Sequence, residues 1–185
     1  MALRIVIGDV TIGIQGQDFS YIFSVGCGGM ESLYKDGKEW LYRTPRPAFW
    51  RAVTDNDRGC GFAFRSAVWS AADRFVRCSR VEARMDGEEI AIPLAPANNK
   101  YTGKETCDSF EIVYTYKTPT VPVTEVTVTY TVETDGRIHV QAEYRGQQGL
   151  PELPVFGMRF LMPTAAERYT YEGLSGETYP DRMAG

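Results

Sequence analysis

The sequence predicts an all-β fold, an antiparallel β-sandwich with one short helix. Apolar and polar residues alternate with period two in segment after segment, which is the pattern of strands with one buried face. Asp-Gly pairs at 36–37, 86–87 and 135–136 supply turns between these segments. Hydrophobic residues make up 43% and charged residues 24% of the 185 residues, as in ordinary globular domains. Residues 1–185 are therefore interpreted as a single domain.

The alternation is clearest over residues 126–145. Val126, Val128, Tyr130 and Val132 fall on one face of an expected strand, and threonines fall on the other. Asp135-Gly136 then signals a tight two-residue hairpin turn. On the return strand, His139 lies on the polar face and is expected to point outward.

The remaining elements follow from the same patterns. A helix is expected between Phe62 and Asp73, where Phe64, Val68 and Ala72 recur at i, i+4 and i+8. Residues 93–103 are expected to form a polar loop or a disordered strip. Further strands are expected over residues 4–7, 11–14, 19–25, 75–85, 110–116, 155–162 and 167–171.

Charge and cysteine content exclude several classes of protein. Twenty basic against 24 acidic side chains give a net charge of −4, without the clustered basic excess expected of a nucleic-acid binder. No apolar run approaches the roughly 18 residues of a membrane helix, and the N-terminus does not resemble a signal peptide. Four cysteines without a C-x-x-C pair, beside His139 as the only histidine, predict free thiols and no metal site. We expect a cytoplasmic protein, although a longer parent could carry an export signal.

The segment richest in chemistry is P-R-P-A-F-W-R-A-V-T-D-N-D-R-G at residues 45–59. Its candidate binding residues are Trp50, Arg51, Asp55, Asn56 and Asp57.

Asp55 and Asp57 allow two interpretations. They could be the carboxylate pair of a glycosidase, which needs an acid and a base or nucleophile roughly 5–10 Å apart. Carboxylates one residue apart in a turn more often accept backbone N–H groups or pair with arginines, here Arg51 and Arg58. We favour this structural role. A calcium loop is not expected, because Gly59 stands where the third oxygen ligand belongs and Ser66 stands where a bidentate Glu belongs.

The string P-x-P-x-F-W-R-A-x-T-D-N-D-x-G closely resembles the hallmark of the C-terminal sandwich domain, or small chain, of large multidomain bacterial β-galactosidases. Residues 19–41 resemble the opening meander of that domain. Residues 171–182 are similar to its G-x-G-P-x-E-x-Y-x-D-R stretch, with Leu174-Ser175 in place of the second Gly-Pro. The motif residues at this end are Glu177, Tyr179, Asp181 and Arg182, for which a structural role is expected.

The resemblance implies part of a galactose mutarotase-like supersandwich, cut from an enzyme that hydrolyses terminal β-galactosides such as lactose. The family's catalytic glutamates lie in a (β/α)₈ barrel and have no counterpart in this chain. The chain is thus expected to be inactive alone, contributing architecture and part of the active-site surroundings. No cofactor is expected in it, whereas the parent family often uses Mg and Na in other domains. Its implied partners are the remaining domains or large subunit, with a galactoside bound in the intact enzyme.

Two further possibilities remain open from the residues alone. Trp40, Trp50 and Trp69 could form a sugar-stacking platform of a carbohydrate-binding module, although at least two of them are expected in the core. A mutarotase-like module would need two histidines and a carboxylate, and His139 is the only histidine.

Uncovered strand edges favour a twofold homodimer through the C-terminal strands.

Overall fold

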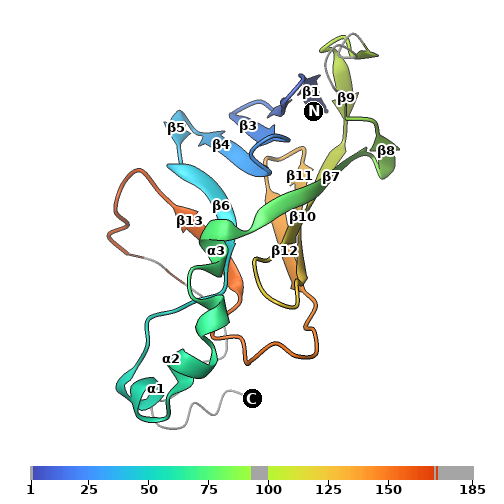
Figure 1. Ribbon diagram of the computed structural model, residues 1–185. Coiled ribbons are helices and arrows are strands. Elements are labelled where there is room, and N and C mark those ends of the chain that lie inside the picture. Colours follow the sequence, from blue (N-terminus) through green and yellow to red (C-terminus); the bar gives the residue numbers. More distant parts are fainter. Residues whose placement is uncertain (1, 93–99, 169, 171–185) are drawn as a thin grey trace.

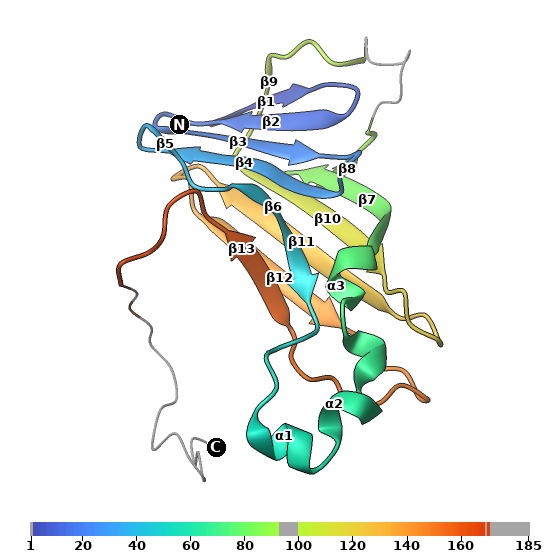
Figure 2. The same ribbon diagram turned by 60° about the vertical axis from the view of Figure 1, so that its left-hand side comes forward.

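The computed structural model describes residues 2–92, 100–168 and 170. Two antiparallel sheets pack face to face, with a two-stranded ribbon beside them and a helical segment at one end (Figures 1 and 2). The prediction of an all-β sandwich is confirmed. No helix in the described residues is long and apolar enough to cross a membrane.

Each sheet has its own strand order. The first has the order β5-β4-β3-β2-β1-β9 and consists of β1 (Leu3–Ile7), β2 (Thr11–Gln15), β3 (Phe19–Ser24), β4 (Gly29–Lys35), β5 (Lys38–Glu39) and β9 (Glu105–Cys107). The second has the order β12-β11-β10-β7-β8 and consists of β7 (Arg77–Met85), β8 (Glu88–Ile90), β10 (Ser109–Lys117), β11 (Glu125–Glu133) and β12 (Ile138–Tyr144). The ribbon pairs β6 (Arg43–Ala48) with β13 (Gly157–Leu161).

The alternating pattern correctly predicts the faces of β10 and β11, whereas Val140 of β12, expected on the apolar face, is 40% exposed. β10 and β11 pair along their whole length, and the four apolar residues predicted to face inward on β11 are all fully buried. His139 is exposed on the opposite face, as predicted. The turn is longer than predicted, because Glu133 N–H donates to Arg137 C=O at 3.0 Å and leaves three residues between them. Gly136, at φ 79°, supplies the left-handed residue of this turn.

Aromatic side chains from both sheets form the core and also bond across it. Phe23 of β3 lies 5.5 Å from Tyr130 of β11 between ring centroids. The Tyr116 hydroxyl donates to Gly28 C=O at 2.7 Å, and the Tyr21 hydroxyl donates to Gly136 C=O at 2.7 Å. Burial raises the pKa of Tyr116, so this hydroxyl stays protonated and remains a donor. These bonds connect turns of one sheet to strands of the other.

Two prolines explain why β6 stays out of the first sheet. Pro45 and Pro47 are two residues apart, so their missing N–H donors would all point to one edge of the strand. In the described residues, β6 is ladder-paired on one edge, with β13, although it also contacts β4. The alternation of apolar and polar residues does not predict β6, β8 or β9, whereas β4 and β5 fall within residues 19–41, for which the family resemblance implies a meander.

The single helix predicted between Phe62 and Asp73 is wrong. That region contains α2 (Phe62–Arg65), the 3₁₀ turn η1 (Ala67–Trp69) and α3 (Ala72–Phe75), which follow α1 (Asp55–Gly59). Ala71 is left-handed at φ 66°, and together with the extended Ser70 it separates η1 from α3.

Tertiary contacts explain the break in this helical segment. The break lets Trp69 enter the core, where its indole N–H donates to Pro151 C=O at 3.1 Å. Phe64, predicted to be on the buried stripe, is instead 87% exposed. Burying Trp69 therefore outweighs the local preference for a continuous helix.

The expected strand over 167–171 is also not observed. Glu167, Arg168 and Thr170 lie in no strand, while residues 169 and 171 lie outside the described residues.

The cross-sheet tyrosine bond can be tested with a matched pair of variants. Tyr116→Phe should lower the free energy of unfolding by about 1–2 kcal/mol, because it leaves the buried Gly28 carbonyl without this donor. Tyr130 is equally buried, but its hydroxyl has no partner in the described part of the chain, so Tyr130→Phe should be neutral or stabilising. Urea unfolding measures both, and equal losses would contradict this assignment.

Candidate functional site

The T-D-N-D motif forms the start of the helical segment. Thr54 is the N-cap of α1, and its hydroxyl accepts the Asp57 N–H at 3.2 Å. In return, the Asp57 carboxylate accepts the Thr54 N–H at 2.8 Å, which completes a capping box. These two hydrogen bonds fix the residue at which α1 begins. None of the residues of α1 is buried.

Arg51 and Asp57 form the strongest pair in the motif. The guanidinium donates two bonds to the carboxylate, at 2.6 and 3.1 Å, and a third to Ala52 C=O at 3.0 Å. It also lies 5.5 Å from the centroid of the Phe62 ring. The Arg51 guanidinium, followed by the Thr54 amide, holds the pKa of Asp57 well below its usual range. Asp57 is thus a fixed anion whose two oxygens are both engaged.

Asp55 points away from this pair. Its side chain is 94% exposed and accepts a bond from Arg58 at 2.6 Å. The predicted pairing of the two aspartates with Arg51 and Arg58 is therefore confirmed. Asp55 is nevertheless a surface residue, and exposed ion pairs of this kind add little stability.

The other candidate residues do not come together at one site. Asn56 is exposed, and its backbone carbonyl accepts the Cys60 N–H at 3.0 Å. Trp50 is partly buried against the core, and Trp69 is fully buried. Trp40 is also partly buried, with the Lys38 ammonium 4.2 Å from its ring centroid. The structure thus does not assemble the three indoles into one sugar-stacking surface.

The second motif cannot be placed. Glu177, Tyr179, Asp181 and Arg182 lie outside the described residues. Within the described ranges, no group of three or more histidine, cysteine, aspartate or glutamate side chains could hold a metal ion.

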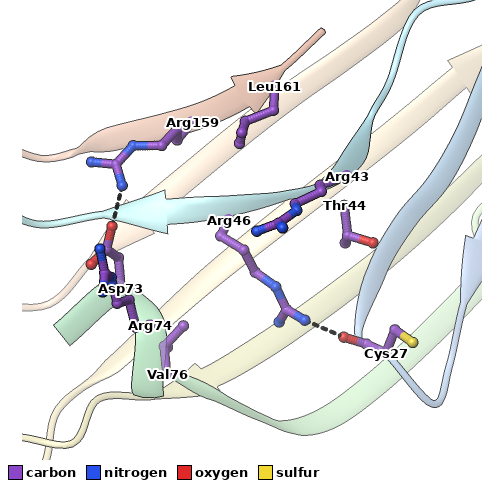
Figure 3. Close-up of a pocket in the computed structure, with 9 residues that line it drawn as sticks. All are labelled: Cys27, Arg43, Thr44, Arg46, Asp73, Arg74, Val76, Arg159 and Leu161. Carbon is purple, nitrogen blue, oxygen red and sulfur yellow. Dashed lines mark hydrogen bonds and ion pairs between the residues drawn. The ribbon is translucent and has the colours of Figure 1, made fainter. Parts of the chain in front are cut away.

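A cleft of about 950 Å³ lies between the ribbon, the turn after β3 and the end of the helical segment (Figure 3). It is lined by Cys27, Arg43, Thr44, Arg46, Asp73, Arg74, Val76, Arg159 and Leu161. We call it the arginine cleft, because four of these side chains are arginines.

The arginine cleft holds more positive than negative side chains. Asp73, its one carboxylate, is mostly buried and pairs with Arg159 (Figure 3). Arg46 donates to Cys27 C=O at 2.8 Å, a neutral acceptor. Within the described part of the chain, neither Arg46 nor the exposed Arg43 and Arg74 forms an ion pair with a carboxylate. The sequence reading missed this cleft, since its arginines come from residues 43–46, 74 and 159 and form no linear cluster.

Residues 15–185 match the family model described as the β-galactosidase small chain. The chain belongs to this β-galactosidase family. The β-galactosidase small subunit of Latilactobacillus sakei is 56% identical over 183 residues, covering 99% of this chain. β-Galactosidases of Clostridium acetobutylicum and Halalkalibacterium halodurans are 38% and 36% identical over 99% and 100% of it. The predicted resemblance to the β-galactosidase small chain is confirmed.

The chain spans only part of each of these β-galactosidase relatives. It corresponds to 58% of the L. sakei small subunit, and to 18% and 17% of the other two proteins.

The two aspartates should differ in their effect on stability. Asp57→Ala removes a helix cap and the Arg51 partner, so the melting temperature should fall by several degrees. Asp55→Ala is the matched control and should shift it by about 1 °C or less, because that carboxylate is exposed. Calorimetry at neutral pH measures both, and equal shifts would contradict the distinct roles.

The Asp57 contribution should also depend on pH. Its pKa is lower in the folded chain than in the unfolded chain, so its stabilisation is complete above the unfolded value, about 4, and is lost as pH falls through the folded value. The melting temperatures of the wild type and Asp57→Asn should therefore converge below about pH 4 and differ by a constant amount between about pH 5 and 7. A gap that widens on acidification would contradict this sign.

Proposed function

We propose that this chain is a non-catalytic part of a β-galactosidase, which hydrolyses terminal β-galactosides such as lactose with catalytic residues located elsewhere. In the intact enzyme it contributes architecture and part of the active-site surroundings. The observation that carries this proposal is the 56% identity to a β-galactosidase small subunit over nearly the whole chain.

The geometry of the acidic motif supports a non-catalytic role. A glycosidase acid needs a raised pKa and a proton to donate, and its partner carboxylate must face the sugar. Asp57 has a lowered pKa and both oxygens bonded, while Asp55 faces solvent beside Arg58. Neither aspartate therefore has the properties of a glycosidase acid.

The large subunit is the proposed partner. The L. sakei relative is itself named a small subunit, which supports a second, larger chain or further domains beside this region. Any galactoside would then be bound by the assembled enzyme.

A carbohydrate-binding module or a mutarotase-like module is the alternative function. The described tryptophans give it little support, because Trp69 is inaccessible and Lys38 lies over the ring of Trp40. His139 is exposed and lies 3.4 Å from Glu133, with no second histidine in the sequence. Titration of tryptophan fluorescence with galactose and lactose separates the hypotheses, since saturable binding to the isolated chain favours the module.

The isolated chain should hydrolyse no β-galactoside, including activated aryl galactosides. Co-expressed with the rest of a β-galactosidase, it should co-purify with it in an active complex. The control is Asp57→Ala in the isolated chain. Turnover by the wild type that this variant abolishes would overturn the non-catalytic role, and failure to co-purify would overturn the architectural one.

The isolated chain should also form a twofold dimer through its C-terminal strands. β12 is an edge of its sheet, β13 has one described partner, and free strand edges favour pairing. Light scattering during size-exclusion chromatography should give a mass that falls on dilution. A mass of one chain at every concentration would contradict this association.

A further inference from the structure

The arginine cleft has a charge that a galactoside does not explain. A neutral sugar offers hydroxyl groups, which need no concentration of guanidinium groups for recognition. The whole chain carries a net charge of −4, yet four arginines and one aspartate line this cleft. The local charge is thus opposite in sign to that of the protein as a whole.

The register of the ribbon produces this concentration of charge. Arg46 of β6 lies directly opposite Arg159 of β13, and like charges opposite each other destabilise a strand pair. Asp73 offsets Arg159 alone. Arg43 approaches the ring of Tyr42, at 5.8 Å from its centroid, and is otherwise open to the cleft. An added anion would relieve the repulsion that the described residues leave in place.

The apolar and backbone groups beside these arginines indicate which kind of anion fits. Leu161 lines the cleft and is 39% exposed, and its neighbours Phe160 and Met162 are exposed as well. In the described residues β13 is ladder-paired on one edge, with β6, so its other edge offers backbone donors and acceptors. A free phosphate would use the guanidinium groups but neither of these features. An extended peptide can use all of them, by adding a strand to β13 and placing carboxylates against the arginines.

We propose that the arginine cleft binds an acidic polypeptide segment from the part of the β-galactosidase that lies outside this chain. The segment extends beside β13, and its Asp or Glu side chains pair with Arg43, Arg46 and Arg74. The inference rests on the proposed function. Polypeptide for this role exists in the relatives, because the aligned region is 58% of the L. sakei small subunit and less of the others.

Matched double variants test the cleft directly. Arg43→Gln with Arg74→Gln removes two exposed charges without breaking an ion pair in the described structure. Arg80→Gln with Arg145→Gln removes the same charge elsewhere, at residues paired with Glu82 and Glu143. Unchanged melting temperatures establish that both variants are folded.

The probe is a fluorescent peptide of alternating Glu and Val, with alternating Lys and Val as its counterpart, and binding is read by anisotropy. The wild type should bind the acidic peptide, the cleft variant about tenfold more weakly, and the control variant within about twofold. Equal weakening by both variants, or equal binding of the Lys peptide, would overturn the proposal. Displacement by millimolar inorganic phosphate would also overturn it, in favour of a small-anion site.

A second arm separates this inference from the proposed function. The wild type and both double variants are co-expressed with the rest of a β-galactosidase, and the recovered complex is quantified. Recovery should fall several-fold for the cleft variant alone. Equal recovery of all three chains would overturn the role of the cleft while the architectural function stands, whereas no recovery even of the wild type would overturn the architectural function itself.

Discussion

The contact between the two sheets at the turn after β3 is the constraint on which the neighbouring structure depends. The buried Tyr116 hydroxyl of β10 donates to Gly28 C=O, so the turn is held down on the second sheet. Gly28 has φ 63°, and a Cβ there would lie 2.3 Å from the Cβ of Cys78 on β7. Only glycine allows this close approach without a shift of the backbone or of Cys78. The carbonyl of the adjacent Cys27 accepts a hydrogen bond from Arg46, and both residues line the arginine cleft.

The T-D-N-D motif fixes the start of the helical segment, which contributes Trp69 and Ala72 to the core. The Arg51–Asp57 pair and the capping box fix where α1 begins, and Arg51 also lies over Phe62 at the start of α2. Trp69 then packs between Phe49 and Tyr144. The motif that most resembles a carboxylate site is therefore an anchor for the segment that completes the core.

The charged residues of the T-D-N-D motif and those of the arginine cleft have different roles. In the acidic motif, each aspartate has an arginine within its own local sequence, so the charges are satisfied internally. In the arginine cleft, Asp73 pairs with Arg159 and Arg46 donates to the neutral Cys27 carbonyl, whereas Arg43 and Arg74 are exposed beside an apolar strand. The first arrangement stabilises the fold, whereas the second has the charge complementarity that the proposed acidic segment requires.

Local sequence was sufficient to predict strands whose faces alternate, such as Glu125–Glu133, and the pairing of Asp55 and Asp57 with nearby arginines. Both depend on contacts between neighbours in sequence or on a simple period of burial. The division of the predicted helix into α2, η1 and α3 depends on long-range contacts, because it places Trp69 against residues about 80 positions away. Only the tertiary structure decided the arginine cleft, since the pairing of β6 with β13 brings together Arg46 and Arg159, which are distant in sequence. Long-range pairing and burial depend on the whole chain, so local sequence patterns do not predict them.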